Sequence, residues 1–174
     1  MAVDADLFRR VMGSFASGVT IVTTLDAAGR PRGFTASGMS SLSLDPRLLL
    51  VCVNTNSATL TAIQARQAFV VNILAEAQRE LAQRFASRLE AAKFNGISWQ
   101  PGTTGLPVLE GALAHAECQV FRIYEGGDHV IILGEVVAAA AGDAVPLLYF
   151  RGRYGVYHGG IASVLGSAED WEIW

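Results

Sequence analysis

Hydroxyl-bearing side chains are concentrated in one short stretch of this sequence. Residues 35–43 read Thr-Ala-Ser-Gly-Met-Ser-Ser-Leu-Ser, which is four serines and one threonine in nine positions. Short hydroxyl side chains and glycine let backbone N–H groups come close to a ligand. The stretch therefore suits a polar heterocycle or a phosphate. A solvated turn, in which Ser and Thr bond to their own backbone, would have the same composition.

A second polar cluster, Asn54-Thr55-Asn56-Ser57, separates an apolar run from the expected start of a helix. Ser57 is a suitable N-cap residue. The N-terminus of a helix offers free N–H groups and the positive end of its dipole, so it can hold a phosphate. Simple capping of the helix explains the same residues without a ligand.

The segment from Arg84 to Arg88 combines two arginines with an aromatic ring. Arg88 could pair with a phosphate and Phe85 could pack on a ring system. Phe85 could equally belong to the core. Further along, Gly126-Gly127-Asp128-His129 places a histidine at a turn, where it could contact a substrate ring or carboxamide. A turn histidine with no task is the alternative.

Near the end of the chain, Tyr149-Phe150-Arg151-Gly152-Arg153-Tyr154 interrupts an apolar strand pattern with arginines. Strand alternation predicts that Tyr149, Arg151 and Arg153 share one face, with Phe150, Gly152 and Tyr154 on the other. Such arginines could hold anionic phosphates, or they could protect an exposed edge strand.

Familiar catalytic and metal-binding motifs are not found in the sequence. There is no Gly-x-Gly-x-x-Gly after a strand, no Gly-x-Ser-x-Gly and no His-Glu-x-x-His. Gly13 and Gly18 have the spacing of a phosphate-binding loop, but Val19 stands where its lysine is required. Cys52 and Cys118 are far apart inside apolar runs and the three histidines are scattered, so we expect two buried thiols and no metal.

Composition points to one globular domain. The chain has 174 residues, of which 51% are hydrophobic and 17% charged, and this excludes global disorder. The apolar excess suggests extra buried surface such as a subunit interface. A net charge of −3 argues against nucleic-acid binding. No apolar run is long enough for a membrane span and the start lacks the pattern of a signal peptide, so a cytoplasmic protein is expected.

Hydrophobic periodicity predicts many strands and few helices. The first helix carries apolar residues at positions 7, 8, 11, 12 and 15, begins at Asp4 or Asp6 and has Gly18 as its C′ residue. Two more helices are expected from Ser57 to about Arg66 and over 76–91, with a loop at 93–107. Strands are expected at 19–25, 32–44 (running into a loop), 48–54, 68–74, 112–124, 129–141 and 146–157. Tight turns and the lack of regular βαβ alternation favour an antiparallel sheet or barrel.

Six blocks, taken in order, resemble the short-chain NAD(P)H:flavin reductases, the flavin-reducing components of two-component monooxygenases. The blocks are FASGVTIVTT, GFTASGMSSLSLDP, FVVNIL with the QRELAQRFA helix, KFNGISW, GGDHVIILGEV and PLLYFRGRYG. They span about residues 6–157. The most specific pieces are Thr-Ala-Ser-x-x-x-Ser-x-Ser-x-x-Pro and Gly-Asp-His.

The resemblance implies a mainly β fold with a few helices: an antiparallel, FMN-binding split β-barrel that forms a homodimer with flavin near the interface. Residues 1–157 would form this domain and 158–174 a tail of unknown role. It also implies flavin contacts from Thr35, Ala36, Ser37, Ser40, Ser41, Val53, Asn54, Ser57, Thr59, Phe85, Ala86, Ser87, Arg88, Lys93 and Phe94. The nicotinamide nucleotide would contact His129, Arg151 and Tyr154.

The implied reaction is hydride transfer from nicotinamide C4 to N5 of free FMN or FAD. The reduced flavin would diffuse to a separate monooxygenase. We identify no arginine for a 2′-phosphate, so NADH is favoured over NADPH. No residue is needed as an acid or base, and His129, which has no visible relay partner, is expected to orient the nicotinamide. The alternatives are a flavin-dependent oxidase or reductase of another small molecule, and a non-catalytic FMN-binding electron carrier.

Overall fold

The computed structural model describes residues 3–87 and 89–158. Helices are few and short: α1 (Ala5–Met12), α2 (Ala58–Arg66) and α3 (Arg79–Ala86), with 3-10 turns η1 (Glu76–Gln78) and η2 (Glu90–Ala92). Within these residues, none of the helices is both long and apolar enough to cross a membrane.

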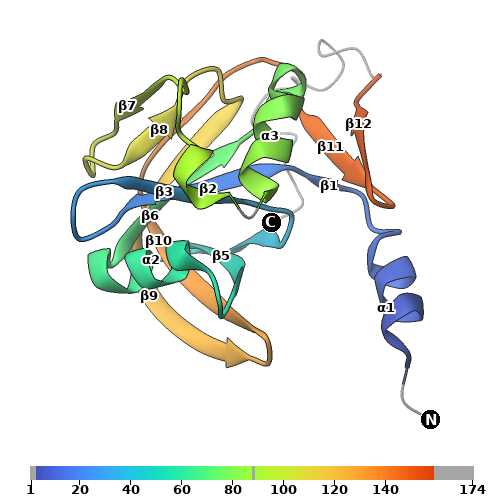
Figure 1. The fold of residues 1–174 in the computed structure, drawn as a ribbon. Coiled ribbons are helices and arrows are strands. Elements are labelled where there is room, and N and C mark those ends of the chain that lie inside the picture. The colour runs from blue at the N-terminus through green and yellow to red at the C-terminus, as the bar shows by residue number, and fades with distance from the viewer. Residues whose placement is uncertain (1–2, 88, 159–174) are drawn as a thin grey trace.

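Antiparallel sheets make up most of the fold (Figure 1). The largest has the order β3-β2-β6-β9-β10-β5-β4. Its strands are β2 (Thr20–Leu25), β3 (Pro31–Ala36), β4 (Met39–Leu44), β5 (Arg47–Asn54), β6 (Ala68–Ile73), β9 (Ala114–Gly126) and β10 (His129–Ala141). Two smaller sheets contain β1 (Ser17–Gly18), β11 (Leu147–Phe150) and β12 (Arg153–Val156), and β7 (Trp99–Pro101) with β8 (Pro107–Leu109). The mainly β, antiparallel prediction is confirmed.

The two outer strands of the large sheet are neighbours in the chain. Only Ser37 and Gly38 separate the end of β3 from the start of β4, although these strands lie at opposite ends of the strand order. The sheet therefore curves until its ends meet at this corner. The Cys52 N–H fixes the corner to β5 by donating to the Gly38 carbonyl at 2.8 Å.

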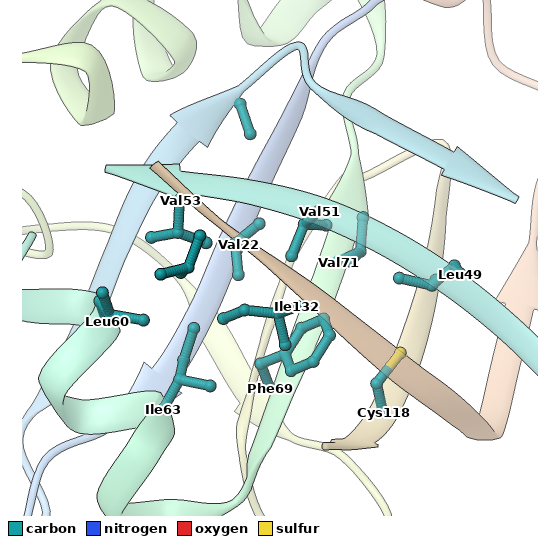
Figure 2. Close-up of a cluster of buried hydrophobic side chains, with 12 residues drawn as sticks. Val22, Leu49, Val51, Val53, Leu60, Ile63, Phe69, Val71, Cys118 and Ile132 are labelled. Carbon is teal, nitrogen blue, oxygen red and sulfur yellow. The ribbon is translucent and has the colours of Figure 1, made fainter. Parts of the chain in front are cut away.

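The concave side of the sheet encloses the main apolar core (Figure 2). Val51 and Val53 point inward from β5, while Cys52 between them is only half-buried, as strand alternation requires. Phe69 from β6 and Ile132 from β10 are fully buried beside them. Helix α2 covers one end of this core with Leu60 and Ile63.

A second core lies under α3. Ala82 and Phe85 are its buried side chains, and they pack with Ile21, Leu74 and Leu147. A Cβ atom on Gly33 would lie 2.9 Å from a ring carbon of Phe85, so only glycine allows this close approach.

Two buried polar residues connect the strands. The Asn72 amide nitrogen donates to the Ile21 carbonyl and to the Thr23 hydroxyl, both at 3.0 Å, and its oxygen accepts from the Leu109 N–H at 2.9 Å. The Glu117 carboxylate accepts from the N–H groups of Thr103 and Thr104 and from the Thr104 hydroxyl, at 2.6–2.9 Å. Both side chains have their hydrogen-bonding capacity used within the chain.

Helix α1 projects from the body of the molecule (Figure 1). The Asp4 carboxylate caps it by accepting from the N–H groups of Asp6 and Leu7. None of its residues is buried. Its apolar positions, Leu7, Phe8, Val11 and Met12, are 47–59% exposed, and Phe15 beyond its end is 76% exposed. An amphipathic helix whose apolar side chains face solvent indicates a missing partner surface.

Several predicted boundaries were wrong. Helix α1 ends at Met12 with Gly13 as its cap, not near Gly18. The loop expected at the end of 32–44 is the strand β4, and the loop expected at 93–107 contains β7. The helix predicted over 76–91 is shorter: α3 begins at Arg79 after the 3-10 turn η1 and ends at Ala86, where Ser87 has an extended backbone. The expected tail, apart from the exposed His158, lies outside the described residues.

Candidate functional site

A small cavity lies beside the corner that joins β3 and β4. Its volume is about 170 Å³. Its lining residues come from segments far apart in the sequence and are Val19, Thr35, Ala36, Ser37, Ala86, Tyr149 and Tyr154. Thr35, Ala36, Ser37, Ala86 and Tyr154 are all sequence-predicted site residues. We call this space the site cavity.

Hydrogen bonds position the corner segment against its neighbours. The Thr35 hydroxyl donates to the Ala82 carbonyl of α3 at 2.6 Å. The Thr20 hydroxyl donates to the Ala36 carbonyl at 2.9 Å. Ala36 is buried, whereas Ser37 is exposed at the mouth of the cavity. Thr35 therefore holds the segment in place, and Ser37 is the hydroxyl available to a ligand.

Two tyrosines form the opposite wall of the site cavity. Tyr149 and Tyr154 pair across the β11–β12 hairpin, with ring centroids 5.3 Å apart and planes at 61°. The Arg79 guanidinium lies 5.8 Å from the centre of the Tyr154 ring. Burial raises the pKa of the Tyr154 phenol, and the neighbouring Tyr149 adds to this effect. The phenol therefore stays protonated at neutral pH and can donate a hydrogen bond.

The hairpin corrects the prediction for residues 149–154. A single strand was expected, with Tyr149, Arg151 and Arg153 on one face. Instead the chain reverses at Arg151 and Gly152, so Tyr149 and Tyr154 are paired rather than on opposite faces. Tyr149 was not among the predicted site residues. A glycine between two tyrosine-bearing runs was the only signal that could have revealed it.

The start of α2 forms a second part of the site region. The Ser57 hydroxyl caps the helix by accepting from the Thr59 N–H at 3.2 Å, which confirms the predicted N-cap. Asn54 is exposed, and its side-chain oxygen accepts from the Asn56 N–H at 2.9 Å. The Thr59 side chain is fully buried, but its hydroxyl has no hydrogen-bond partner, alone among the buried side-chain polar atoms in the described part of the chain. Val53, also predicted, belongs to the core, so it can offer a ligand only its backbone.

His129 lies beside this second segment. It begins β10 directly opposite Asn54, the last residue of β5. Its Nδ1 atom is 2.8 Å from the Asp128 carboxylate, a partner that the sequence did not reveal. The hydrogen bond with His129 holds the pKa of Asp128 below its ordinary value. Since Gly38 bonds to Cys52 on the same strand, the corner and His129 flank the same end of β5.

Other predicted residues are used within the fold or lie away from the site cavity. Phe85 is fully buried and packs edge-on against Phe94, with centroids 4.8 Å apart. The buried Lys93 amine donates to the Gly33 carbonyl and forms an ion pair with Glu90. Ser40 and Ser41 are exposed on β4. The Ser87 hydroxyl, directly after α3, accepts from the Leu89 N–H. Arg88 lies outside the described residues.

Comparison with known proteins gives the same family over nearly the whole chain. The family model described as "Flavin reductase like domain" matches residues 12–158. The reductase subunit HsaB of a flavin-dependent monooxygenase from Mycobacterium tuberculosis is 40% identical over 155 residues, which are 87% of this chain and 82% of that protein. The NADH-dependent FAD reductase of Streptomyces globisporus is 39% identical over 148 residues, 83% of this chain and 80% of that protein.

Solved structures are also similar to this chain in fold and sequence. Nitrilotriacetate monooxygenase component B from Mycobacterium thermoresistibile superposes with a TM-score of 0.83 at 42% identity, covering 87% of this chain and 86% of that one. The Streptomyces globisporus NADH:FAD oxidoreductase SgcE6, in complex with NAD and FAD fragments, has a TM-score of 0.83 at 37% identity and covers 90% and 96%. The resemblance found in the sequence is confirmed, and this chain belongs to the flavin reductase family.

Proposed function

We propose that this chain is an oxidoreductase that reduces free FMN or FAD with NADH or NADPH and supplies the reduced flavin to a separate monooxygenase. The observation that carries the proposal is the site cavity, where Thr35–Ser37, Ala86 and Tyr154 meet. Relatives named as monooxygenase reductase subunits and as an NADH-dependent FAD reductase support it.

Residues of the site cavity and of the start of α2 together fit a flavin. Burying a hydroxyl without a partner is unfavourable, so the Thr59 hydroxyl is best explained as a group that awaits an oxygen of a ligand. A ribityl hydroxyl or a phosphate oxygen at the N-terminus of α2 would satisfy it. Ser37 and the protonated Tyr154 phenol would face the ring system. We assign Asn54, Ser57 and Ser87 to the edges of the same ligand, while Phe85, Lys93 and Phe94 serve the fold.

The chain itself has little chemistry to perform. When bound, the flavin accepts the hydride at N5 from nicotinamide C4. The protein must hold the two rings in contact, which is the main contribution that positioning makes to the rate. Backbone N–H groups of the 35–41 segment are our candidates for the donors that stabilise charge developing on the flavin. Because the Thr35 hydroxyl bonds to α3, it fixes the direction of these donors.

We assign His129 to orientation of the nicotinamide. The Asp128 carboxylate at Nδ1 fixes the ring and leaves Nε2 for the ligand. His129→Ala should therefore raise the apparent KM for NADH about tenfold and change kcat less, since a lost hydrogen bond to a ligand is worth roughly 1–1.5 kcal/mol. Asp128→Asn should give a smaller change in the same direction. Loss of kcat at constant KM would instead make His129 a proton-transfer group.

We also propose that the curved sheet forms the family's split barrel and that two copies form a homodimer. Phe8, Met12 and Phe15 are exposed apolar side chains that a second copy would cover, and they support the dimer.

The site cavity, about 170 Å³, is smaller than the roughly 300–1,000 Å³ usual for ligand pockets, so a partner surface would complete it. Light scattering should give twice the chain mass. Phe8→Asp with Met12→Asp should halve that mass, and Thr61→Asp, an exposed change on α2, should not.

A cytoplasmic location is part of the proposal. Cys52 and Cys118 are both free, as expected for a protein in a reducing compartment.

The function is tested by following NADH oxidation with FMN, with FAD and without added flavin. Oxidation that depends on added flavin and saturates with it is the expected result. Binding of FMN without steady NADH oxidation would contradict the proposal and favour the electron carrier or another substrate. NADPH, in place of NADH, gives the preference between the two nucleotides.

A further inference from the structure

A groove of about 670 Å³ lies between α1 and the turn of the β11–β12 hairpin. Three arginines line it, Arg9 and Arg10 from α1 and Arg151 from the turn, and none of its described lining residues is acidic. The Arg151 N–H donates to the Gly13 carbonyl at 2.8 Å, which ties the turn to the end of the helix. We call this space the arginine groove.

The positive charge of the groove is largely unpaired within the described part of the chain. Arg9 forms an ion pair with Asp6 at 2.9 Å, but both side chains are exposed, and exposed pairs are weak. Arg10 has no ion pair among the described residues. Arg151 donates from Nε to the neutral Ser14 hydroxyl at 3.3 Å, which brings it no negative charge. The groove therefore favours an occupant with carboxylates.

Apolar side chains lie beside these arginines in the groove. Leu7 and Val11 of α1 are 47% and 59% exposed, and Tyr149 of β11 adds an aromatic ring. Phe8 and Met12, which a second copy would cover in the proposed dimer, are not among the lining residues. The groove therefore suits an occupant with both acidic and apolar side chains, and a second copy on Phe8 and Met12 would leave it open.

The chain itself contains a stretch of this composition. Residues 159–174, which we call the acidic segment, include Glu169, Asp170 and Glu172 and no lysine, arginine or histidine. Two of the three tryptophans of the chain, Trp171 and Trp174, stand among these acids. The segment carries a charge of −3, which equals the net charge of the whole chain, so the remaining residues are balanced overall. Its charge and its apolar side chains both complement the arginine groove.

The acidic segment is attached close to the groove. It follows β12, and from the turn that lines the groove to His158 the extended chain spans only roughly 20 Å. Residues 159–168, which precede the first acid, can span up to roughly 33 Å. A tether of this length gives an effective concentration on the order of millimolar, so weak contacts are enough to hold the segment.

We propose that the acidic segment binds in the arginine groove of the same chain. The carboxylates of Glu169, Asp170 and Glu172 pair with the guanidinium groups through charge-assisted hydrogen bonds, and the tryptophans pack on the apolar side chains of α1. Because Tyr149 lines both the groove and the site cavity, a segment seated here lies beside one wall of the candidate site. The family model ends at His158, so the occupant is not part of the shared domain.

Tryptophan fluorescence of the full chain tests the contact. The variant Trp99→Phe leaves Trp171 and Trp174 as the only tryptophans, so emission and acrylamide quenching report the acidic segment alone. In this background, Arg9→Gln with Arg10→Gln should weaken the contact about fivefold, because two exposed charge pairs are lost. The quenching constant should rise and the emission should shift to longer wavelength. Salt at about 1 M should have the same effect through screening.

The matched control removes two exposed arginines that do not line the groove. Arg66→Gln with Arg122→Gln should leave the quenching constant unchanged. A further variant alters the acidic segment and leaves α1 intact: Glu169→Gln, Asp170→Asn and Glu172→Gln. It should raise the quenching constant as well, and it should speed amide exchange in residues 7–14, because α1 loses its cover. Neither measurement needs flavin or nicotinamide nucleotide, so both are independent of the proposed function.

Three results would overturn the inference. A quenching constant that neither the arginine variant nor the segment variant changes would show that these charges do not hold the segment. Increased quenching in the segment variant with unchanged amide exchange in residues 7–14 would place its binding surface elsewhere. Quenching that decreases as the protein concentration is raised would assign the acidic segment to the groove of a second copy.

Discussion

Asn72 and Thr59 are both buried polar residues, but their surroundings are opposite. Asn72 lies among the strands and uses both ends of its amide, on β2 and on β8. Thr59 lies at the start of α2 and has an unpartnered hydroxyl. An unsatisfied buried polar group costs roughly 1–3 kcal/mol, so its presence needs an explanation, and a bound ligand would provide one. The difference separates a polar group that holds the strands together from one that, under the proposed function, is available to a ligand.

Two glycines show a similar difference between the core and the candidate site. A Cβ atom on Gly134 would lie 2.5 Å from the Phe69 ring and 2.8 Å from the Cys118 Cβ, inside the core. A Cβ atom on Gly38, at the site corner, would lie 3.2 Å from the Cys52 Cβ, which is only tight. The core around Gly134 is therefore packed more tightly than the corner around Gly38.

The largest expected effect comes from Asn72→Leu. The change leaves the Leu109 N–H and the Ile21 carbonyl in the core without this partner, so the free energy of unfolding should fall by about 3 kcal/mol or more. Urea unfolding of the wild type and the variant measures it. A fall below about 1 kcal/mol would mean that water or neighbouring groups replace the amide, and the comparison with Thr59 would lose its basis.

The matched pair Gly134→Ala and Gly38→Ala tests the packing difference. Overpacking a closely filled core typically costs about 1–3 kcal/mol, so we expect that loss at Gly134 and less than about 1 kcal/mol at Gly38. Thermal unfolding of both variants in the same buffer gives the ranking. Equal losses would contradict a corner that is looser than the core.

Glu117, a second buried polar residue whose partners lie within the chain, should make the stability of the fold depend on pH. Burial opposes its ionisation, but hydrogen bonds from Thr104 and Thr103 outweigh this and lower its pKa from the ordinary 4.5. A lowered folded pKa contributes stability that is complete above the unfolded pKa and is lost as the pH falls through the folded pKa. Glu117→Gln should cost about 1–2 kcal/mol at neutral pH and flatten the loss of stability below pH 4.5. An unchanged acid profile would show that other carboxylates control it.

The smallest effect on stability is expected from Thr59→Val. Removing an unpartnered hydroxyl of similar volume should leave the unfolding free energy of the flavin-free protein unchanged or raise it by up to about 1 kcal/mol. Binding of FMN, followed by its fluorescence, should weaken about five- to tenfold because one hydrogen bond is lost. Thr61→Val, on the exposed side of the same helix, is the control. A stability loss without a change in FMN binding would make Thr59 a structural residue.

Sequence patterns predicted the strongly periodic parts of the fold. Ser57 was identified as an N-cap because capping is a local property, and β5 was found because residues 48–53 form an unbroken apolar run of strand length. The β11–β12 turn was missed because Arg151 contradicts the usual residue preference at positive φ. Short strands such as β7 carry too few residues for a recognisable period.

The sequence predicted which segments contribute to the candidate site, but not how their side chains are arranged in space. Residues 35–37 were singled out by composition, and the structure places them in one cavity with Tyr154. Phe85 looks the same in the sequence whether it faces a ligand or the core, and only Gly33 above it reveals the core position. Lys93 was expected to close over the flavin, but its amine bonds to the Gly33 carbonyl and to Glu90. Gly33 is far from Lys93 in the sequence, so no local pattern could reveal this contact.

Amide hydrogen exchange of the wild-type chain, with and without saturating FMN, tests most directly whether the proposed site segments bind the ligand while the core strands serve only the fold. Binding to the folded state slows exchange where the ligand orders the backbone. We predict slower exchange in residues 35–41, 55–59 and 147–156, and no local change in the paired centre of β9 and β10. Unchanged exchange in these three segments, or protection confined to other parts of the chain, would contradict the assignment of the site.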